Sequence, residues 1–327
     1  MDVTLGIDIG GTNTKLGLVT RNGTCPVHTS IETEAHKPVE NFITNLCIAV
    51  EQLKVEIGEG HSIKAVGVGA PNANYYTGYI ENAPNLDWGE KVPLAKLIQD
   101  KVHLPIWITN DANAAALGEM KFGVAQGMKN FVVITLGTGL GSGFVMDGRL
   151  VYGHDGFAGE MGHITCVPGG RMHTTGLKGS LETYVSATGI KKTLFELLAN
   201  RVEDSRLRRL SFDEVEAKDI NEAALEGDVI AQEAFHITGT LLGQALHDVV
   251  VMYDPEAIII FGGLAKAGSL IMDPTEKSLN ALLPSVYANK VKLLSSNLQG
   301  HNTAILGSSA LAWQEWEEME KAEAAAS

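Results

Sequence analysis

The stretch Asp8-Ile9-Gly10-Gly11-Thr12-Asn13-Thr14-Lys15 decides how this chain folds at its start. Apolar runs at Val3–Ile9 and Leu16–Val19 flank it, so the pattern predicts a β-hairpin with a glycine turn. Glycines let the backbone approach a ligand closely, and their amides can point at phosphate oxygens. Asp8 would repel a phosphate, but it can hold a hydrated Mg²⁺ that the phosphate also binds. The stretch therefore indicates an ATP site that is not a P-loop.

The composition of the whole chain limits the classes of protein to which it can belong. The 327 residues suffice for two domains, and 36 glycines suit an α/β protein rich in tight turns. A net charge of -14 argues against nucleic acid or an anionic membrane as a partner. Three widely spaced cysteines form no disulfide framework, nothing near Asp2 suggests a signal peptide, and no apolar run is long enough to span a bilayer. We expect a soluble, cytoplasmic protein.

Strands and helices alternate after the first hairpin. The sequence predicts a helix at Val39–Ile57, a strand at Ile63–Val68, a second helix near Pro93–Lys101 and a strand at Pro105–Thr109. Asn110-Asp111 follow that last strand and precede a helix predicted over Ala112–Phe122. The end of such a strand is where α/β proteins place ligands.

The second half opens with a similar pattern. An apolar strand at Asn130–Leu136, a glycine turn at Gly137–Gly143 and a strand at Phe144–Met146 suggest an internal duplication. A dinucleotide-binding fold would place a helix directly after such glycines, so we reject that interpretation. A phosphate cradle between two strands fits better, with an ordinary tight hairpin as the alternative. Further helices and strands are predicted at Leu181–Ala199, Glu214–Glu226, Val229–Met252, Ala257–Phe261, Leu293–Ser295 and Ala304–Glu320.

Several polar residues are candidates for chemistry. Asp111 can cap the helix that follows it, or it can act as a general base toward a substrate hydroxyl. Glu160, His163 and Glu182 are typical of a sugar site, because carboxylates accept hydrogen bonds from sugar hydroxyls and an imidazole can donate or accept one. The alternative is that they are ordinary polar residues on the surface of a loop, as most Glu and His residues in loops are. His163, Cys166 and His173 give three possible metal ligands, whereas a closed zinc site needs four.

Eight motifs together resemble the ROK family, bacterial sugar kinases with related repressors, within the actin/hexokinase/Hsp70 superfamily. They follow one another in family order over essentially the whole chain: Asp8-x-Gly-Gly-Thr, Asn85-Leu86-x-Trp88, Asn110-Asp111, Leu136-Gly-Thr-Gly-x-Gly, Glu160-x-Gly-His163, Pro168-Gly-Gly, Gly179-Ser180-Leu181-Glu182 and Phe261-Gly-Gly.

The resemblance implies a fold and an activity. The fold is α/β, with two duplicated ribonuclease-H-like (actin-like ATPase) domains and an interdomain cleft. We expect a small domain from 1–112 with a returning C-terminal helix, 302–327, and a large domain from 113–301. The implied reaction transfers phosphate from ATP, with Mg²⁺, to the 6-hydroxyl of a hexose, most simply glucose, and releases ADP.

The resemblance also implies roles for individual residues. Asp111 would be the catalytic base, and Asp8 would hold Mg²⁺ through water. The sugar ligands would be Gly69, Asn85, Asn110, Glu160, His163 and Glu182. The nucleotide ligands would be Asp8, Gly10, Gly11, Thr12, Lys15, Thr138, Gly139, Gly262 and Gly263.

One departure from the family concerns zinc. Many members carry three cysteines after Pro-Gly-Gly that hold a structural zinc with the sugar-binding histidine. This chain has His173, Thr175 and Ser180 at those positions, and Thr and Ser are poor zinc ligands. We therefore expect no structural zinc.

Alternatives remain open at this point. An N-acetylhexosamine kinase or a fructokinase would share the chemistry and change the sugar. A sugar-sensing regulator without catalysis is a different class; the family's repressors carry an N-terminal DNA-binding motif, for which a hairpin starting at Val3 leaves no room. The family commonly forms homodimers, and the helix near Leu194–Leu198 offers an apolar surface for one.

Overall fold

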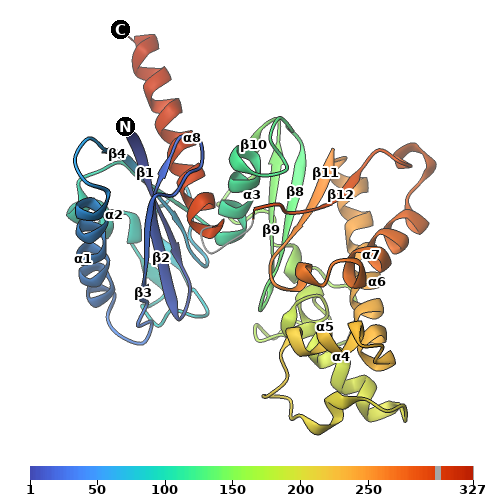
Figure 1. Ribbon diagram of the computed structural model, residues 1–327. Helices are drawn as coiled ribbons and strands as arrows, with labels where there is room; N and C mark the ends of the chain where they lie inside the picture. Colours follow the sequence, from blue (N-terminus) through green and yellow to red (C-terminus); the bar gives the residue numbers. More distant parts are fainter. Residues whose placement is uncertain (299–302, 327) are drawn as a thin grey trace. The chain divides into compact units, whose positions relative to one another are not determined.

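The protein is described here by a computed structural model that covers residues 1–298 and 303–326 (Figure 1). Contacts group these residues into two compact units. Unit 1 comprises Met1–Lys129, Gly143–Gly159 and the described residues of 296–327, and unit 2 comprises Asn130–Ser142 and Glu160–Ser295. Each unit is described by itself below.

The grouping by contacts differs from the predicted domains, 1–112 with 302–327 and 113–301. Helix α3 (Asp111–Phe122) lies in unit 1 because it packs against α8 (Thr303–Ala326). A Cβ added to Gly118 of α3 would lie only 3.0 Å from the Cα of Gly307 in α8. The predicted border between 301 and 302 falls outside the described residues, and the domain division stays a prediction.

A five-stranded mixed sheet forms the centre of unit 1. Its strand order is β3-β2-β1-β4-β7, in which β1, β2 and β3 are antiparallel and β4 and β7 run parallel to β1. The predicted first hairpin is confirmed, while the third strand was not foreseen. The strands are β1 (Asp2–Ile9), β2 (Asn13–Thr20), β3 (Val27–Glu32), β4 (Ser62–Gly69) and β7 (Ile106–Thr109).

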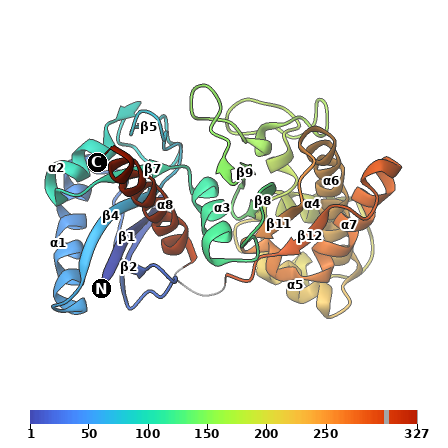
Figure 2. The same cartoon turned by 90° about the horizontal axis from the view of Figure 1, so that it is seen from above.

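Helices cover both faces of this sheet (Figure 2). Helices α1 (Val39–Ile57) and α2 (Leu94–Val102) lie on one face, and α8 crosses the other. Two glycines let α8 approach the strands: a Cβ at Gly67 would lie 1.9 Å from the carbonyl oxygen of Ser308, and one at Gly6 would also collide with α8. The backbone of α8 therefore rests directly on β1 and β4.

A second five-stranded sheet has the order β10-β9-β8-β11-β12. When the five strands of each sheet are numbered in chain order, both sheets have the same spatial order, 3-2-1-4-5. Strand β11 runs parallel to β8 and β12, and β10 pairs antiparallel with β9. The division by contacts falls within β9, between Ser142 and Gly143. The strands are β8 (Phe131–Leu136), β9 (Leu140–Met146), β10 (Arg149–Leu150), β11 (Ala257–Phe261) and β12 (Lys292–Ser295).

Four helices complete unit 2, namely α4 (Ala187–Asn200), α5 (Ala217–Leu225), α6 (Val229–Tyr253) and α7 (Ser269–Leu282). The single helix predicted over Leu181–Ala199 is divided, because the Ser186 hydroxyl caps α4 by accepting from the amide of Gly189. A short 3₁₀ turn, Leu181–Thr183, precedes the cap. Leu194 and Leu198 are buried in the unit, so the prediction that this face of α4 serves a homodimer is wrong.

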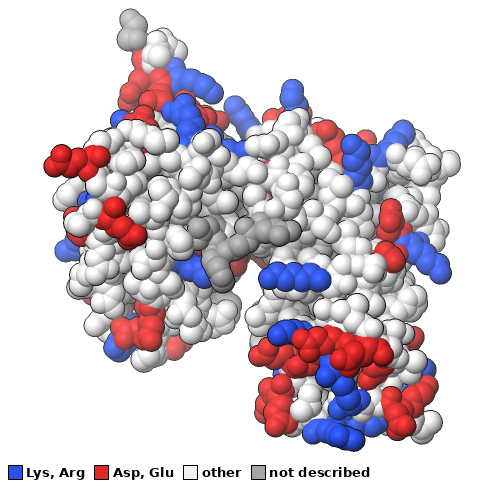
Figure 3. Space-filling model, in the orientation of Figure 1, with Lys and Arg blue, Asp and Glu red and all other residues white. Residues whose placement is uncertain are grey.

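The surface mixes both signs of charge. On the face seen in Figure 3, acidic and basic side chains alternate over the α4 and α5 end of unit 2, where Arg206 pairs with Glu222 and Glu226.

Across residues 1–298 and 303–326, none of the helices combines the length and apolarity that crossing a bilayer requires. Two further short strands, β5 (Ile80–Glu81) and β6 (Lys91–Val92), pair in a loop of unit 1.

Candidate active site

Strand register brings several predicted residues of unit 1 into one row. Asp8 on β1 lies opposite Lys15 on β2 and opposite Gly69 on β4, and Gly69 in turn lies opposite Thr109 on β7. Asn110 and Asp111 come directly after Thr109. Because β1, β4 and β7 are parallel, the row marks their common carboxyl edge, where α/β proteins bind ligands.

The carboxyl group of Asp8 carries an electrostatic cost. Its pKa is raised from the ordinary 3.8 to about 6, chiefly by burial and then by the negative charge of Asp111, while Lys15 lowers it in part. Among the described residues, no hydrogen-bond donor is recorded for the Asp8 carboxylate. Two neighbouring carboxylates without enough positive charge are the setting that a bound cation relieves, so these residues fit the Mg²⁺ that accompanies ATP.

Asn110 and Asp111 have separate tasks at the start of α3. Asn110 is the helix cap, because its Oδ1 accepts from the amides of Ala112 at 2.7 Å and Asn113 at 3.4 Å. The side-chain NH₂ of Asn110 makes no hydrogen bond to any other described residue. Asp111 Oδ1 also accepts from the Ala112 amide, at 2.8 Å.

Asp111 therefore does not serve as the cap. The residue is accessible at the surface of its unit, but surrounding protein atoms crowd the carboxyl group. This burial raises the pKa of Asp111, and hydrogen bonds from the Ala112 and Asp111 amides lower it in part. A raised pKa moves the carboxylate toward the range in which it accepts a proton from a hydroxyl effectively.

The first glycine turn is closed by local contacts. The Gly10 amide donates to the Asn13 carbonyl at 3.0 Å, and the Thr33 hydroxyl donates to the Gly10 carbonyl at 2.7 Å. Gly11 touches Asn85, since a Cβ added at Gly11 would lie 3.0 Å from the Cβ of Asn85. The structure thus brings the phosphate turn and one predicted sugar ligand together, and Thr12 of the same turn is exposed.

In unit 2, Glu160 immediately precedes the 3₁₀ turn Met161–His163 and His163 is its last residue, and both are exposed. The Met161 amide donates to the Ser142 hydroxyl at 3.1 Å, and a Cβ at Gly162 would lie 2.5 Å from the Leu140 carbonyl oxygen. The turn is therefore fixed to the start of β9.

Glu182 reaches the same part of β9. Its Oε2 accepts from the Leu140 amide at 2.7 Å, and its Oε1 lies 2.6 Å from Nε2 of His173. A side chain at Gly139 would collide with this carboxylate, because an added Cβ would lie 2.2 Å from Oε2. The predicted sugar ligands of unit 2 therefore cluster around the second glycine turn.

The loop between His163 and Leu181 is anchored by Arg171, which was not singled out from the sequence. Its guanidinium donates to the Glu196 carboxylate at 2.6 and 2.8 Å and stacks 4.3 Å from the ring centre of Tyr184. Its other acceptors are the carbonyls of Thr183 and Gly189 and the hydroxyl of Thr193. The backbone amide of Arg171 donates to the Tyr184 hydroxyl at 2.9 Å.

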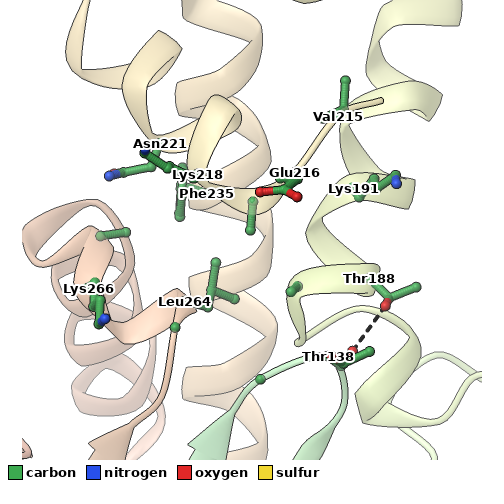
Figure 4. A pocket seen from close by; sticks show the side chains of 15 residues that line it. Thr138, Thr188, Lys191, Val215, Glu216, Lys218, Asn221, Phe235, Leu264 and Lys266 are labelled. Atoms are coloured by element: carbon green, nitrogen blue, oxygen red, sulfur yellow. Dashed lines mark hydrogen bonds between the residues drawn. The ribbon is translucent and has the colours of Figure 1, made fainter. Parts of the chain in front are cut away.

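A cavity of about 750 Å³ opens in unit 2 beside the second glycine turn (Figure 4). Thr138 from the β8–β9 turn and Gly263 from the turn after β11 both line it. Gly262 has φ +109°, and a Cβ there would lie 2.5 Å from the Leu136 carbonyl oxygen, so this turn needs a glycine. The Thr188 hydroxyl donates to the Thr138 carbonyl at 3.0 Å and holds the turn at the cavity wall.

Sequence reasoning missed most of the cavity wall. The missed residues come from α4, from α5 and the residue that precedes it, from α6 and from the 3₁₀ turn Leu264–Ala267. They include Lys191, Glu216, Asn221, Phe235, Leu264 and Lys266. In Figure 4 they surround the space from separate elements. No spacing in the sequence connects them, because only tertiary packing makes them neighbours.

Comparison with known proteins agrees with this arrangement. A sequence model of the ROK family matches residues 4–315. The glucokinase of Streptomyces coelicolor is 34% identical over 318 residues, which cover 95% of this chain and 98% of that protein. The crystal structure of a ROK family glucokinase from Streptomyces griseus, in complex with glucose and AMPPNP, has a TM-score of 0.80 and 34% identity, covering 95% of this chain and 99% of that one.

A second group of relatives are regulators. The xylose repressor of Caldicellulosiruptor bescii is 32% identical over 234 residues, 71% of this chain and 58% of the repressor. The match to glucokinases extends over nearly the full length of both chains. Fold and similarity together define the class of protein as a sugar kinase with a mixed α/β architecture. Within that class, the chain belongs to the ROK family.

Proposed function

We propose that this protein transfers the γ-phosphate of ATP to the 6-hydroxyl of a hexose, with glucose as the preferred sugar, and releases ADP and hexose 6-phosphate. The observation that carries the proposal is the row of Asp8, Gly69 and Thr109 at the carboxyl edge of one sheet, with Asp111 two residues after Thr109. The glucose and AMPPNP bound to the Streptomyces griseus relative support both the sugar and the donor.

Asp111 is the proposed general base. As the sugar oxygen forms a bond with the γ-phosphorus, the bond from that phosphorus to the oxygen of ADP breaks, and the hydroxyl proton passes to Asp111. The NH₂ of Asn110 is positioned by its capping role and can donate to the same sugar. Phosphoryl transfer depends mainly on such positioning and on charge stabilisation.

Asp8 would hold Mg²⁺ through water, and Lys15 lies opposite it on β2. When bound, the cation supplies positive charge that offsets the developing charge on the phosphate oxygens. The turn Gly10, Gly11 and Thr12 would receive phosphate oxygens through its amides. In unit 2 the same task falls to Thr138 and Gly139.

The remaining ligands follow from the same assignment. Gly69, Asn85, Asn110, Glu160, His163 and Glu182 would bind the sugar hydroxyls. Gly262 and Gly263 would receive the adenosine, and the cavity of about 750 Å³ has the size and the mostly apolar wall of a nucleotide pocket.

Several finer expectations belong to this proposal. The common strand order of the two sheets supports two duplicated domains of the actin-like ATPase type. We also propose a cytoplasmic protein that forms a homodimer through a face other than that of Leu194 and Leu198. An N-acetylhexosamine kinase or a fructokinase stays as the alternative for the sugar.

The competing function is a sugar-responsive regulator, which the similarity to xylose repressors favours. A regulator would bind sugar without turnover, whereas the proposed roles of Asp8 in holding Mg²⁺ and of Asp111 as the base are needed only for transfer. The two functions therefore differ in whether ADP is released.

The test is ADP release measured with Mg·ATP and a panel of glucose, mannose, fructose, N-acetylglucosamine and N-acetylmannosamine. We expect the highest kcat/KM with glucose. Asp111→Asn keeps an oxygen for the Ala112 amide but removes the base, so kcat should fall about 100-fold or more while calorimetry still detects sugar binding. Asp87→Asn, an exposed aspartate of the same unit, is the control. Wild-type protein that releases no ADP with any sugar would refute the proposal.

A further inference from the structure

The loop that carries a structural zinc in many ROK proteins has a different chemistry in this chain. His173, Thr175 and Ser180 stand at the three cysteine positions. Both ring nitrogens of His173 are engaged by protein groups, Nδ1 by Thr175 and Nε2 by Glu182. Hydroxyl groups are poor zinc ligands, so these residues do not fit a closed zinc site.

Hydrogen bonds determine which nitrogen of His173 carries the proton. The backbone amide of Thr175 donates to Nδ1 at 3.1 Å, so Nδ1 offers a lone pair. The Thr175 hydroxyl, 2.7 Å from the same atom, can then only donate to it. A neutral imidazole in this setting has its proton on Nε2, which donates to Oε1 of Glu182 at 2.6 Å.

His173 is well placed to hold this bond. Its side chain is buried, with 9% of its surface exposed. Its amide donates to the Leu177 carbonyl at 2.7 Å, and its carbonyl accepts from the Gly176 amide at 2.9 Å, which closes a tight turn around it. Arg171, two residues earlier, anchors the loop to α4. The imidazole therefore has little freedom to move.

The Glu182 carboxylate is in consequence held at both oxygens. Oε1 accepts from His173 and Oε2 from the Leu140 amide. Each carboxylate oxygen can accept a second hydrogen bond, so the group still has capacity for two sugar hydroxyls. Without the bond from His173, the carboxylate could rotate about the Oε2 contact and present its oxygens wrongly.

We infer that His173 is a positioning residue that orients the Glu182 carboxylate for sugar binding, in place of the metal-centred loop of other family members. The inference rests on the proposed function, because it assumes that Glu182 binds the sugar. His173 itself does not touch the reacting atoms.

Three variants test the inference. His173→Ala removes the donor, so the KM for glucose should rise at least about tenfold, as expected for the loss of a hydrogen bond to a charged group. The KM for ATP should stay within about twofold of wild type. His173→Gln keeps an N–H near the position of Nε2 and should restore most of the glucose affinity. Thr174→Ala is the matched control, since Thr174 is exposed and makes no hydrogen bond among the described residues.

The outcomes separate the two proposals. A wild type that phosphorylates none of the sugars contradicts the proposed function. If the wild type is active, two results overturn the positioning role alone. Either His173→Ala leaves the KM for glucose unchanged, or it raises the KM values for glucose and ATP equally. Failure of His173→Gln to rescue also overturns it.

A second readout does not depend on activity. Imidazole nitrogen NMR of the sugar-free wild type should show His173 as the neutral form protonated at Nε2, assigned by its loss in His173→Gln. Glu182→Gln should change that Nε2–H signal, because the acceptor charge is gone. A His173 protonated at Nδ1, or a signal unaffected by Glu182→Gln, would contradict the inference.

Discussion

Replacing Asp8 by asparagine should make the protein more stable at neutral pH while it removes the proposed Mg²⁺ ligand. The ionised carboxylate of Asp8 is partly buried and lies near the negative Asp111, and both effects disfavour its charge. Asparagine has nearly the same shape and no charge. The substitution therefore relieves a cost that the folded protein carries at this site.

The magnitude follows from the pKa of Asp8, which is about 6 in the folded protein against an ordinary value of 3.8. Between these two values the folded protein keeps a proton that the unfolded protein has lost, so the free energy of unfolding falls as the pH rises through this window. The full difference corresponds to about 3 kcal/mol. Because Asp8 is partly exposed, we expect Asp8→Asn to gain about 1 to 3 kcal/mol at pH 8 and little at about pH 4.

Tryptophan fluorescence suits this measurement, because all four tryptophans, Trp88, Trp107, Trp313 and Trp316, lie in unit 1 with Asp8. Urea unfolding of both proteins at a series of pH values gives the difference directly. Asp87→Asn, an exposed aspartate in the same unit, should show no pH-dependent gain. A constant difference between wild type and Asp8→Asn from pH 4 to pH 8 would show that the charge of Asp8 is not the cause.

Two further predictions concern the loop of unit 2. Arg171→Met should destabilise that unit by about 2 to 4 kcal/mol, since it removes the hydrogen bonds to Glu196 and to three further acceptors. Hydrogen exchange in the loop measures this loss. Arg201→Met, whose exposed ion pair with Glu203 is worth little, is the control, and equal effects of the two would contradict the anchoring role. Purified protein should contain far less than one zinc per chain by elemental analysis, and stoichiometric zinc would disprove the hydrogen-bonded loop.

The first half of the fold could be predicted because local patterns decide it. Val39–Ile57 carries its apolar residues at helical spacing and forms α1 with those bounds. The glycine turn after Ile9 lies between two apolar runs and forms the β1–β2 hairpin. Strand β3 (Val27–Glu32) lies at the sheet edge and was missed because only Val27 and Ile31 of its six residues are strongly apolar.

The candidate site could be predicted only as far as motifs reach. Asp8 lies near the carboxyl end of β1 and Asp111 comes just after β7, and the carboxyl ends of parallel strands meet at one edge of a sheet, so motif positions alone indicate their proximity. The division of labour between Asn110 and Asp111 could not be foreseen, because it depends on which of them begins the helix. The contact of His173 with Glu182 joins residues nine apart through a folded loop, and no periodicity indicates it.

The way in which the loop around His173 is held has a consequence for how the enzyme tolerates its surroundings. A zinc site with thiolate ligands holds its loop only while metal is present and the cysteines are reduced. In this chain the equivalent loop depends on Arg171, whose guanidinium stays charged under physiological conditions, and on the neutral imidazole of His173. Neither group needs a metal or reacts with mild oxidants. The orientation of Glu182 should accordingly persist under chelators, which would remove zinc from a loop that holds it with thiolate ligands.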